Sequence, residues 1–262
     1  MAEETRTLGF GVTYDMAAAQ TACGQLLSLT SHRANDEFPP HRHVNNYVCM
    51  VLNGSFAEVQ SNRCRERMAG SFFLHEAGET HFDRIGARGA MCLNLHFAPE
   101  EMPPARIEGH FSTSAKVAAD KLAFELVARC RDELVMASLA AEIMVDVQPC
   151  RKEPRDLGSW INKIVEAIGD EPGHRWSLRE LAELADRHPV HLAQTFRART
   201  GISVGAFQRI RRLTSLSLAL QRRKCSLVTL ADEFGYCDQS HMNAEFRAAF
   251  GVSPGRYRRD FH

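Results

Sequence analysis

Alternation of apolar and polar side chains marks the segment from about residue 8 to 98 as β-rich. Residues 92–97 alternate strictly between the two kinds, and this period of two predicts a half-buried strand. Asn53-Gly54 follows the apolar run 48–52. Asn-Gly after an apolar run predicts a hairpin turn, because both residues tolerate positive φ. Glycines separate further short segments, so the pattern predicts an all-β barrel or sandwich.

Helical periodicity replaces this alternation in residues 115–147, which contain no Gly or Pro. Apolar residues recur there every four positions: Leu122, Leu126, Cys130 and Leu134. We predict that this stripe contributes to a homodimer interface, with packing on its own β-rich segment as the alternative. The polar segment 148–157 carries two prolines and predicts a linker. Residues 158–262 have helical patterns throughout, including a capping box at Ser177-Leu178-Arg179-Glu180.

The C-terminal helical zone contains an internal repeat. The pattern Phe-Arg-x-x-x-Gly-x-Ser begins at Phe196 and again fifty residues later at Phe246. Each copy predicts a helix, a short turn, a second helix and a Gly-x-Ser exit, which is typical of helix-turn-helix units. Periodicity alone leaves an alternative, in which two helical hairpins pack together without DNA.

The charge distribution favours DNA. The whole chain has no formal net charge. Residues Leu157 to His262 nevertheless contain 16 Lys+Arg and 11 Asp+Glu, a charge of +5 that leaves −5 for the residues before them. Arg and Lys supply the phosphate contacts of DNA-binding proteins, and Arg209, Arg211 and Arg212 are among the basic residues beside the repeat.

The most specific motif is Leu-Ala-x-x-x-Gly-Tyr-x-Asp-x-Ser-His-x-x-x-x-Phe-Arg-x-x-Phe-Gly-x-Ser-Pro-x-x-Tyr-Arg, from Leu230 to Arg258. It resembles the signature of AraC/XylS-type bacterial transcriptional regulators, and residues 158–262 are similar to their DNA-binding domain. The resemblance implies seven helices, with two helix-turn-helix units joined by a long helix from about Val204 to Arg223. At about 1.5 Å per residue this helix spans about 30 Å, close to one DNA turn, so each chain is expected to enter two successive major grooves.

Side-chain chemistry within the two implied recognition helices predicts the DNA contacts. Amides of Gln and Asn suit adenine, and the predicted base-reading residues are His191, Gln194, Gln239, Ser240 and Asn243. Arg197 and Arg247 are predicted to bind phosphate. Met242 and Ala244 stand where the family often has Phe and Arg, which predicts weaker base reading by the second helix.

A second, less specific resemblance covers about residues 25–98. The residues that carry it are His41-Arg42-His43, Tyr47, Gly54, Gly70, Gly78 and His81. They resemble the two motifs of a cupin β-barrel, which implies that His41, His43 and His81 could hold Zn²⁺ or Fe²⁺. Tyr47 stands where the family has a metal-binding Glu. Recognition of an organic effector by His41, His43, Tyr47 and His81 without metal is therefore the alternative.

The cysteines and the N-terminus indicate the cellular compartment. Eight cysteines are scattered without a CxxC pair, which predicts reduced thiols. Thiol sensing by Cys49, Cys64 or Cys92 is an alternative to core packing, but it needs a lowered thiol pKa. The first ten residues lack the apolar run of a secretory signal, and no apolar run approaches the length of a membrane span. The sequence predicts a cytoplasmic protein without a membrane partner.

Together these patterns predict an α+β chain of two domains that is a transcriptional regulator and not an enzyme. The predicted parts are a cupin-like, jelly-roll effector domain (1–112), a helical dimerisation segment (113–148), a linker (149–157) and an AraC-type DNA-binding domain (158–262). The expected partners are double-stranded DNA, a small-molecule effector, a second copy of the chain and, for an activator, RNA polymerase. The alternative is a cupin metalloenzyme, such as a dioxygenase, with an accessory helical domain. The missing Glu and the C-terminal motif favour the regulator.

Overall fold

The computed structural model describes residues 5–61, 63–98, 101, 107–129, 132–147 and 159–261. The chain divides into two compact units. Unit 1 comprises Met1–Leu122 and Arg131–Pro154, and unit 2 comprises Ala123–Cys130 and Arg155–His262. A mixed sheet precedes a series of helices, as the sequence pattern predicted. Within the described residues, no helix combines the length and apolar character needed to cross a membrane.

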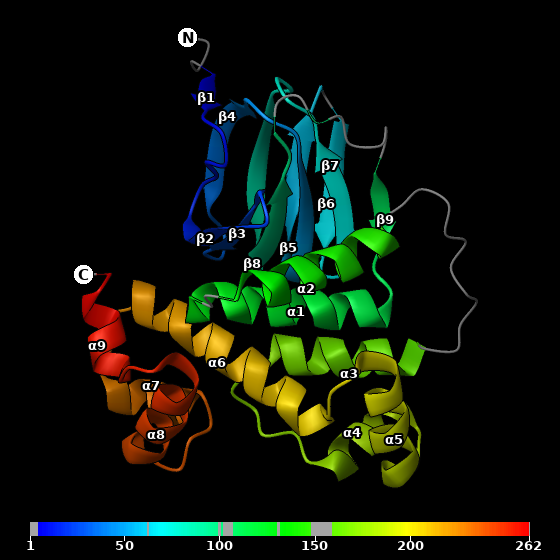
Figure 1. Cartoon of the computed structure of the whole chain (residues 1–262), viewed down its shortest axis with the longest axis vertical. Helices are drawn as coiled ribbons and strands as arrows, with labels where there is room; N and C mark the ends of the chain where they lie inside the picture. Colours follow the sequence, from blue (N-terminus) through cyan, green and yellow to red (C-terminus); the bar gives the residue numbers. More distant parts are fainter. Residues whose placement is uncertain are drawn as a thin grey trace. The chain divides into compact units, whose positions relative to one another are not determined.

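A nine-stranded sheet forms most of unit 1 (Figure 1). Its strands are β1 Arg6–Leu8, β2 Met16–Ala22, β3 Gln25–His32, β4 Glu37–His43, β5 Tyr47–Gln60, β6 Arg63–Met68, β7 Ser71–His75, β8 His81–His96 and β9 Glu108–His110. The long strands β5 and β8 pair antiparallel at its centre. Strand β8 changes its other partner along its length, from β4 near His81 to β3 near His96.

The Asn53-Gly54 pair is not a hairpin turn, so this prediction was wrong. Strand β5 continues through it, with register shifts between Val51 and Asn53 and between Gly54 and Phe56. Gly54 has φ +72°, and a Cβ there would lie 1.9 Å from the carbonyl oxygen of Gly89 on β8. Glycine is needed at this position because the neighbouring backbone passes too closely for any side chain, which is typical of a β-bulge.

Strand β8 confirms the predicted alternation but is buried on both faces. Leu93 and Leu95 are fully buried on one face, while Asn94 and His96 are 2% exposed on the other. The polar face is satisfied internally, because Ser28 Oγ lies 2.8 Å from His96 Nε2 and accepts from Asn94 Nδ2 at 3.3 Å. The polar half of the pattern therefore lines an interior rather than a solvent-facing surface.

Two helices follow the sheet, α1 Thr113–Ala128 and α2 Glu133–Asp146. Part of the apolar stripe that was predicted as a dimer interface is buried within the chain itself, since Leu122 is 0% and Leu126 2% exposed. Leu134 is 75% exposed, and Cys130 lies outside the described residues. The homodimer thus remains a prediction, but this stripe is not the free surface that the periodicity suggested.

Unit 2 contains seven complete helices among the described residues, besides the end of α1. They are α3 Ser159–Asp170, α4 Leu178–Ala185, α5 Pro189–Thr200, α6 Val204–Arg222, α7 Leu227–Glu233, α8 Gln239–Phe250 and α9 Pro254–Arg259. The long helix α6 runs between α3–α5 and α7–α9 (Figure 1). Phe196, Phe207 and Phe246 are fully buried in the interior of unit 2. The capping box is confirmed, since Ser177 accepts from the Glu180 amide and the Glu180 carboxylate accepts from the Ser177 amide.

Candidate nucleic-acid interface and buried histidine cluster

The fifty-residue repeat is a repeat of helix ends. Gly201 ends α5 and Gly251 ends α8, each in the left-handed region at φ +74° and +71°. Two residues on, Ser203 and Ser253 cap the next helices, α6 and α9, with side chains that accept from backbone amides. Helix pairs α4–α5 and α7–α8 therefore share the same exit geometry, because glycine relieves the left-handed strain and serine satisfies a free amide.

Helix α5 presents a row of polar side chains to solvent. His191, Gln194 and Arg197 are exposed at spacings of three, whereas Leu192 and Phe196 are fully buried. His188 caps the start of the helix, and its Nδ1 accepts from the Val190 amide at 3.3 Å. All three predicted DNA contacts of this helix lie on one accessible face.

Helix α8 presents a shorter polar face. Ser240, Ala244 and Arg247 are exposed, while Gln239 and Asn243 are half-buried. Met242 is 0% exposed and packs in the core. The Met242 side chain does not reach the surface, so the predicted weaker base reading of this helix rests on Ala244.

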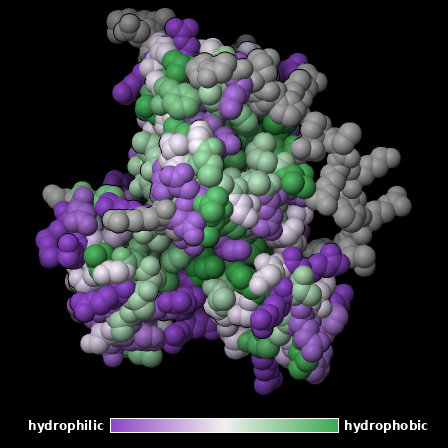
Figure 2. Space-filling view, in the orientation of Figure 1, coloured by the Kyte–Doolittle hydropathy of each residue, from purple (hydrophilic) through white to green (hydrophobic). Residues whose placement is uncertain are grey.

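Several arginines beside the repeat hold the fold instead of facing solvent. Arg211 is 1% exposed and donates to the Gly169 carbonyl. Arg212 pairs with Glu245 at 3.2 Å and lies 5.1 Å from the Tyr236 ring. These two side chains are unavailable to phosphate. Arg197 and Arg247, by contrast, are exposed and have no ion-pair partner among the described residues. Figure 2 shows hydrophilic side chains gathered over both helix pairs.

Glu245 joins α8 to α6 through two arginines, Arg209 at 3.0 Å and Arg212 at 3.2 Å. Burial alone would raise the pKa of Glu245, but the charge of Arg212, the nearby Tyr236 hydroxyl, the hydrogen bond from Arg212 and the charge of Arg209 lower it from its ordinary value near 4.5. The folded state therefore releases this proton more readily than the unfolded state. The ionised Glu245 carboxylate therefore stabilises the fold fully above its ordinary pKa, and this stabilisation disappears as the pH falls through the lower pKa of the folded state.

Glu245→Gln is accordingly expected to lower the free energy of unfolding at pH 7 by about 1–3 kcal/mol, with the difference from wild type shrinking as the pH falls below the ordinary pKa near 4.5. Both tryptophans of the chain, Trp160 and Trp176, belong to unit 2, so urea unfolding followed by tryptophan fluorescence measures it. Glu183→Gln is the control, because its pair with Arg179 is highly exposed and worth little. Equal losses in both variants, or a loss that persists at low pH, would contradict this role.

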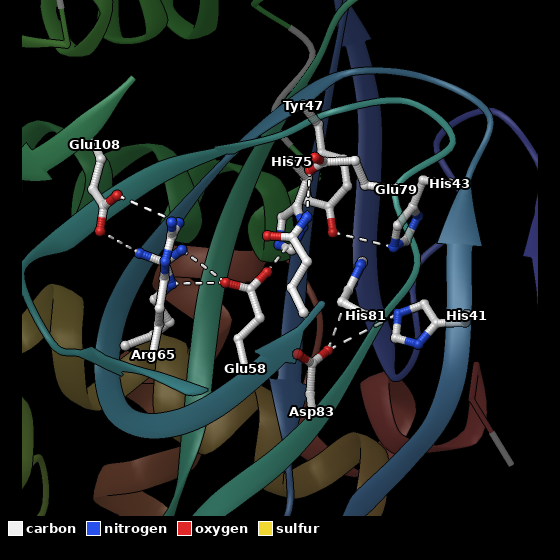
Figure 3. Close-up of polar contacts among 12 residues, drawn as sticks. His41, His43, Tyr47, Glu58, Arg65, His75, Glu79, His81, Asp83 and Glu108 are labelled. Atoms are coloured by element: carbon white, nitrogen blue, oxygen red, sulfur yellow. Dashed lines mark hydrogen bonds and ion pairs between the residues drawn. The ribbon is translucent and has the colours of Figure 1, made fainter. Parts of the chain in front are cut away.

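Unit 1 gathers a buried cluster of histidines and carboxylates (Figure 3). Its members come from four strands: His41 and His43 from β4, Tyr47 and Glu58 from β5, His75 from β7, and His81 and Asp83 from β8. Strand pairing brings them together, since His41 lies opposite His81 and Tyr47 opposite His75. Ligand atoms of His41, His43 and His81 lie within 4.8 Å of one another. The structure thus places the three predicted metal ligands together.

Backbone carbonyls orient two of these imidazoles. His41 Nδ1 lies 2.9 Å from the Pro39 carbonyl and His43 Nδ1 lies 3.2 Å from the Val12 carbonyl. A carbonyl only accepts, so each Nδ1 carries the proton and each Nε2 offers a lone pair to the cluster. Tyr47 Oη lies 3.2 Å from His43 Nε2. Burial raises the pKa of Tyr47 well above 10, so its hydroxyl keeps its proton and donates to His43.

Burial disfavours charge on the histidines of the cluster and on Asp83. It lowers the pKa of His43 to about 3, with further contributions from His81 and His41, and it lowers the pKa of His81 to about 4. Burial, followed by the charge of Glu58, raises the pKa of Asp83 well above its ordinary value. Near neutral pH the imidazoles are therefore neutral, and burial favours the protonated form of Asp83. Neutral imidazoles are the form that binds metals.

Glu58 and Asp83 are cluster members that the sequence motifs did not identify. Glu58 is 3% exposed and accepts from Arg67 Nη2 at 2.7 Å and Arg67 Nε at 2.9 Å, both through Oε2. Its other oxygen, Oε1, lies 3.4 Å from His75 Nδ1. Strict alternation along β5 places residues 47 and 58 on opposite faces, and the bulge at Gly54 reverses this parity. In the sequence, the only sign of a role for Glu58 was an acidic residue within a β-rich segment.

A small cavity of about 40 Å³ adjoins the cluster. His41, His43, Tyr47, His75 and Asp83 are among its lining residues. Cys49 and Cys92 also line it and are buried. Burial, with a contribution from Cys92, raises the pKa of the Cys49 thiol well above its ordinary value. This favours the core-packing interpretation of Cys49 over thiol sensing, because a reactive thiol needs a lowered pKa.

Comparison with known proteins finds relatives of the helical repeat. Residues 181–260 match the helix-turn-helix domain model. An uncharacterized HTH-type transcriptional regulator of Haemophilus influenzae is 30% identical over 99 residues, covering 38% of this chain and 33% of the relative. The HTH-type transcriptional regulator MtrA of Neisseria gonorrhoeae is 27% identical over 108 residues, covering 41% of this chain and 35% of the relative. The matched segment therefore spans about a third of the length of these relatives.

Among solved structures, the C-terminal domain of AraT, a response regulator from Geobacillus stearothermophilus, is similar to 39% of this chain over 85% of its own length, at 24% identity and a TM-score of 0.37. The sequence matches agree with the motif from Leu230 to Arg258. The C-terminal part of the chain carries a helix-turn-helix domain of the AraC type, homologous to those of AraC-family transcriptional regulators.

Proposed function

We propose that the protein is a sequence-specific, DNA-binding transcriptional regulator controlled by a ligand bound in unit 1. The observation that carries this proposal is the helix-turn-helix domain at residues 181–260, with His191, Gln194 and Arg197 on one exposed face of α5. Its relatives are transcriptional regulators. This favours a regulator over a metalloenzyme with an accessory helical domain. We further propose a second copy of the chain as a partner and, for activation, RNA polymerase.

Two features of unit 2 support binding to two successive major grooves. The repeated helix ends give α4–α5 and α7–α8 the same exit geometry, and we propose that each pair is a helix-turn-helix unit. The connecting helix α6 has 19 residues and therefore spans about 28 Å, which approaches the roughly 34 Å of one DNA turn. One chain could then contact two grooves on the same DNA face.

We propose unequal roles for the two recognition helices. Helix α5 reads bases with His191 and Gln194, since both are exposed and the Gln amide can bind adenine through two hydrogen bonds. Arg197 binds phosphate beside them. On α8, Gln239, Ser240 and Asn243 remain candidate base readers. Ala244 offers no polar group, so Arg247 acts mainly as a phosphate anchor.

A pair of substitutions tests this assignment. Gln194→Ala is expected to weaken binding to the preferred operator by about 1–3 kcal/mol and to relax specificity at one base position. Arg247→Ala is expected to weaken all sequences about equally and to lower the salt slope by about one. Fluorescence anisotropy with an operator selected from a random duplex library, and with its single-base variants, measures both.

The control is Arg84→Ala, which removes an exposed charge from unit 1, where Arg84 pairs with Glu37. It is expected to leave both quantities unchanged. If Arg247→Ala relaxes specificity while Gln194→Ala changes no operator variant, the roles are reversed. Failure of the wild-type chain to select any duplex would refute the proposed function itself.

A further inference from the structure

The buried cluster of unit 1 contains a second ligand set that neither sequence motif includes. Glu58, His75 and His81 each offer one ligand atom, and these atoms lie within 4.8 Å of one another. His75 and His81 also stack closely, with ring centroids 4.5 Å apart. This set shares His81 with the motif-derived set of His41 and His43. Two alternative three-residue sites therefore meet at a single imidazole.

One ring nitrogen of His81 is buried without a hydrogen-bond partner among the described residues. The His81 side chain is 2% exposed, and the nitrogen in question is Nε2. The nearest carboxylate oxygen, Oδ2 of Asp83, is 3.9 Å away, which is too far for a hydrogen bond. An unpaired buried imidazole nitrogen is costly, and a cation bound to its lone pair would satisfy it.

Hydrogen bonds within the cluster favour the second set over the first. In the motif-derived set, Tyr47 donates to His43 Nε2, so the lone pair that a metal would need is already used. In the second set, Arg67 holds Glu58 by Oε2 alone and leaves Oε1 toward His75. An outer guanidinium that fixes one carboxylate oxygen and orients the other is a typical support for a metal ligand.

Arginine side chains hold Glu58 and its neighbour Glu108 on the side away from His75. Arg67 is the buried cation that contacts Glu58, and its Nη1 also donates to Glu108 at 2.8 Å. Glu108 also pairs with Arg65 at 3.6 Å, and the charge centre of Arg67 lies 3.7 Å from the Phe73 ring. Two guanidinium groups thus balance two carboxylates, and an ion would bind Glu58 through Oε1, the oxygen that accepts neither of the two Arg67 hydrogen bonds.

The size of the cavity favours a metal ion over an organic effector. The cavity beside the cluster holds about 40 Å³, enough for one or a few water molecules. Pockets that enclose organic ligands usually measure about 300–1,000 Å³. A metal ion needs no more room than its ligands leave, and His75 is the member of the second set that lines this cavity.

We propose that Glu58, His75 and His81 bind one divalent transition-metal ion, next to the small cavity that His75 lines. Two imidazoles and one carboxylate suit Fe²⁺ and Zn²⁺. The ion would tie together β5, β7 and β8. That this ion is the ligand controlling DNA binding rests on the proposed function, whereas metal binding itself does not.

Metal titration of the full chain, purified without a histidine tag and stripped with a chelator, tests the site in the absence of DNA. Zn²⁺, and Fe²⁺ under anaerobic conditions, are added singly, and bound metal is measured by elemental analysis after gel filtration. We expect one ion per chain. Glu58→Gln and His75→Gln are expected to weaken binding by more than the roughly 10–100-fold that loss of an outer-shell partner costs.

His41→Gln is the matched control, because His41 belongs only to the motif-derived set, and its affinity is expected to stay within tenfold of wild type. Loss of Arg67's partner in Glu58→Gln could unfold unit 1, so the metal-dependent rise in Tm of wild type and of His75→Gln gives an independent readout. The proposal is overturned if wild type binds less than a tenth of an ion, or if His41→Gln abolishes binding while His75→Gln does not. Metal binding by a chain that selects no DNA would uphold the site and refute only the regulatory role.

Discussion

Raising the salt concentration from about 50 to about 200 mM is expected to weaken binding of the full chain to duplex DNA by roughly 10³–10⁵-fold. The reason is release of the cations condensed on DNA when roughly six to ten phosphates are neutralised by Arg and Lys. Unit 2 exposes enough such side chains without a carboxylate partner among the described residues: Arg187, Arg197, Arg199, Lys224, Arg247, Arg256 and Arg259. Arg211 and Arg212 do not contribute, because both are buried.

Fluorescence anisotropy of a labelled duplex, repeated over a series of KCl concentrations, measures this effect. A plot of log affinity against log salt should be linear, with a slope set by the number of phosphates contacted. Arg84→Ala, on unit 1, should reproduce the wild-type slope. An affinity that changes less than tenfold over this range would show that the exposed arginines of unit 2 do not face DNA phosphates.

Phe246→Ala is expected to destabilise unit 2 by about 3–5 kcal/mol, because it leaves a cavity in a closely packed aromatic cluster. Phe246 is fully buried. Its ring stacks on Phe250 at 4.1 Å between centroids and meets Tyr257 at 5.3 Å. These contacts fix α8 against α9, so we also expect faster amide hydrogen exchange throughout α7–α9 and weaker DNA binding.

Urea unfolding followed by tryptophan fluorescence gives the free energy, and hydrogen exchange locates the loosened helices. Arg247→Ala is the matched control, since it removes the adjacent exposed side chain on the same helix and should stay within about 0.5 kcal/mol of wild type. Unchanged exchange in α8 of Phe246→Ala would mean that the aromatic cluster does not hold this helix in place.

The proposed metal site differs from the one that the cupin-like motif of the sequence indicates. The motif residues His41, His43 and His81 do converge, but Tyr47 occupies the lone pair of His43. Glu58 supplies a carboxylate from another position of the same strand. A motif therefore locates the buried cluster correctly without identifying which of its members are free to bind a ligand.

The sequence by itself determined the features that depend on short-range geometry. The fifty-residue repeat set the helix ends, because Gly201 and Gly251 tolerate left-handed φ and the serines that follow cap the next helices. Histidines two positions apart on β4 had to share a face, because side chains alternate along a strand. Exposure of His191 and Gln194 followed from the apolar positions between them.

Only the tertiary structure decided which polar groups are buried and what they meet. Glu58 turns inward because a bulge at Gly54 reverses the alternation of β5, and that bulge depends on the close passage of Gly89 on β8. Arg212 forms an ion pair with Glu245, 33 residues away along the chain, and is therefore not available to DNA. Such contacts join segments that local periodicity treats separately. The sequence pattern therefore shows which residues can share a face, whereas pairing between distant segments decides whether that face meets solvent, a partner or a buried charge.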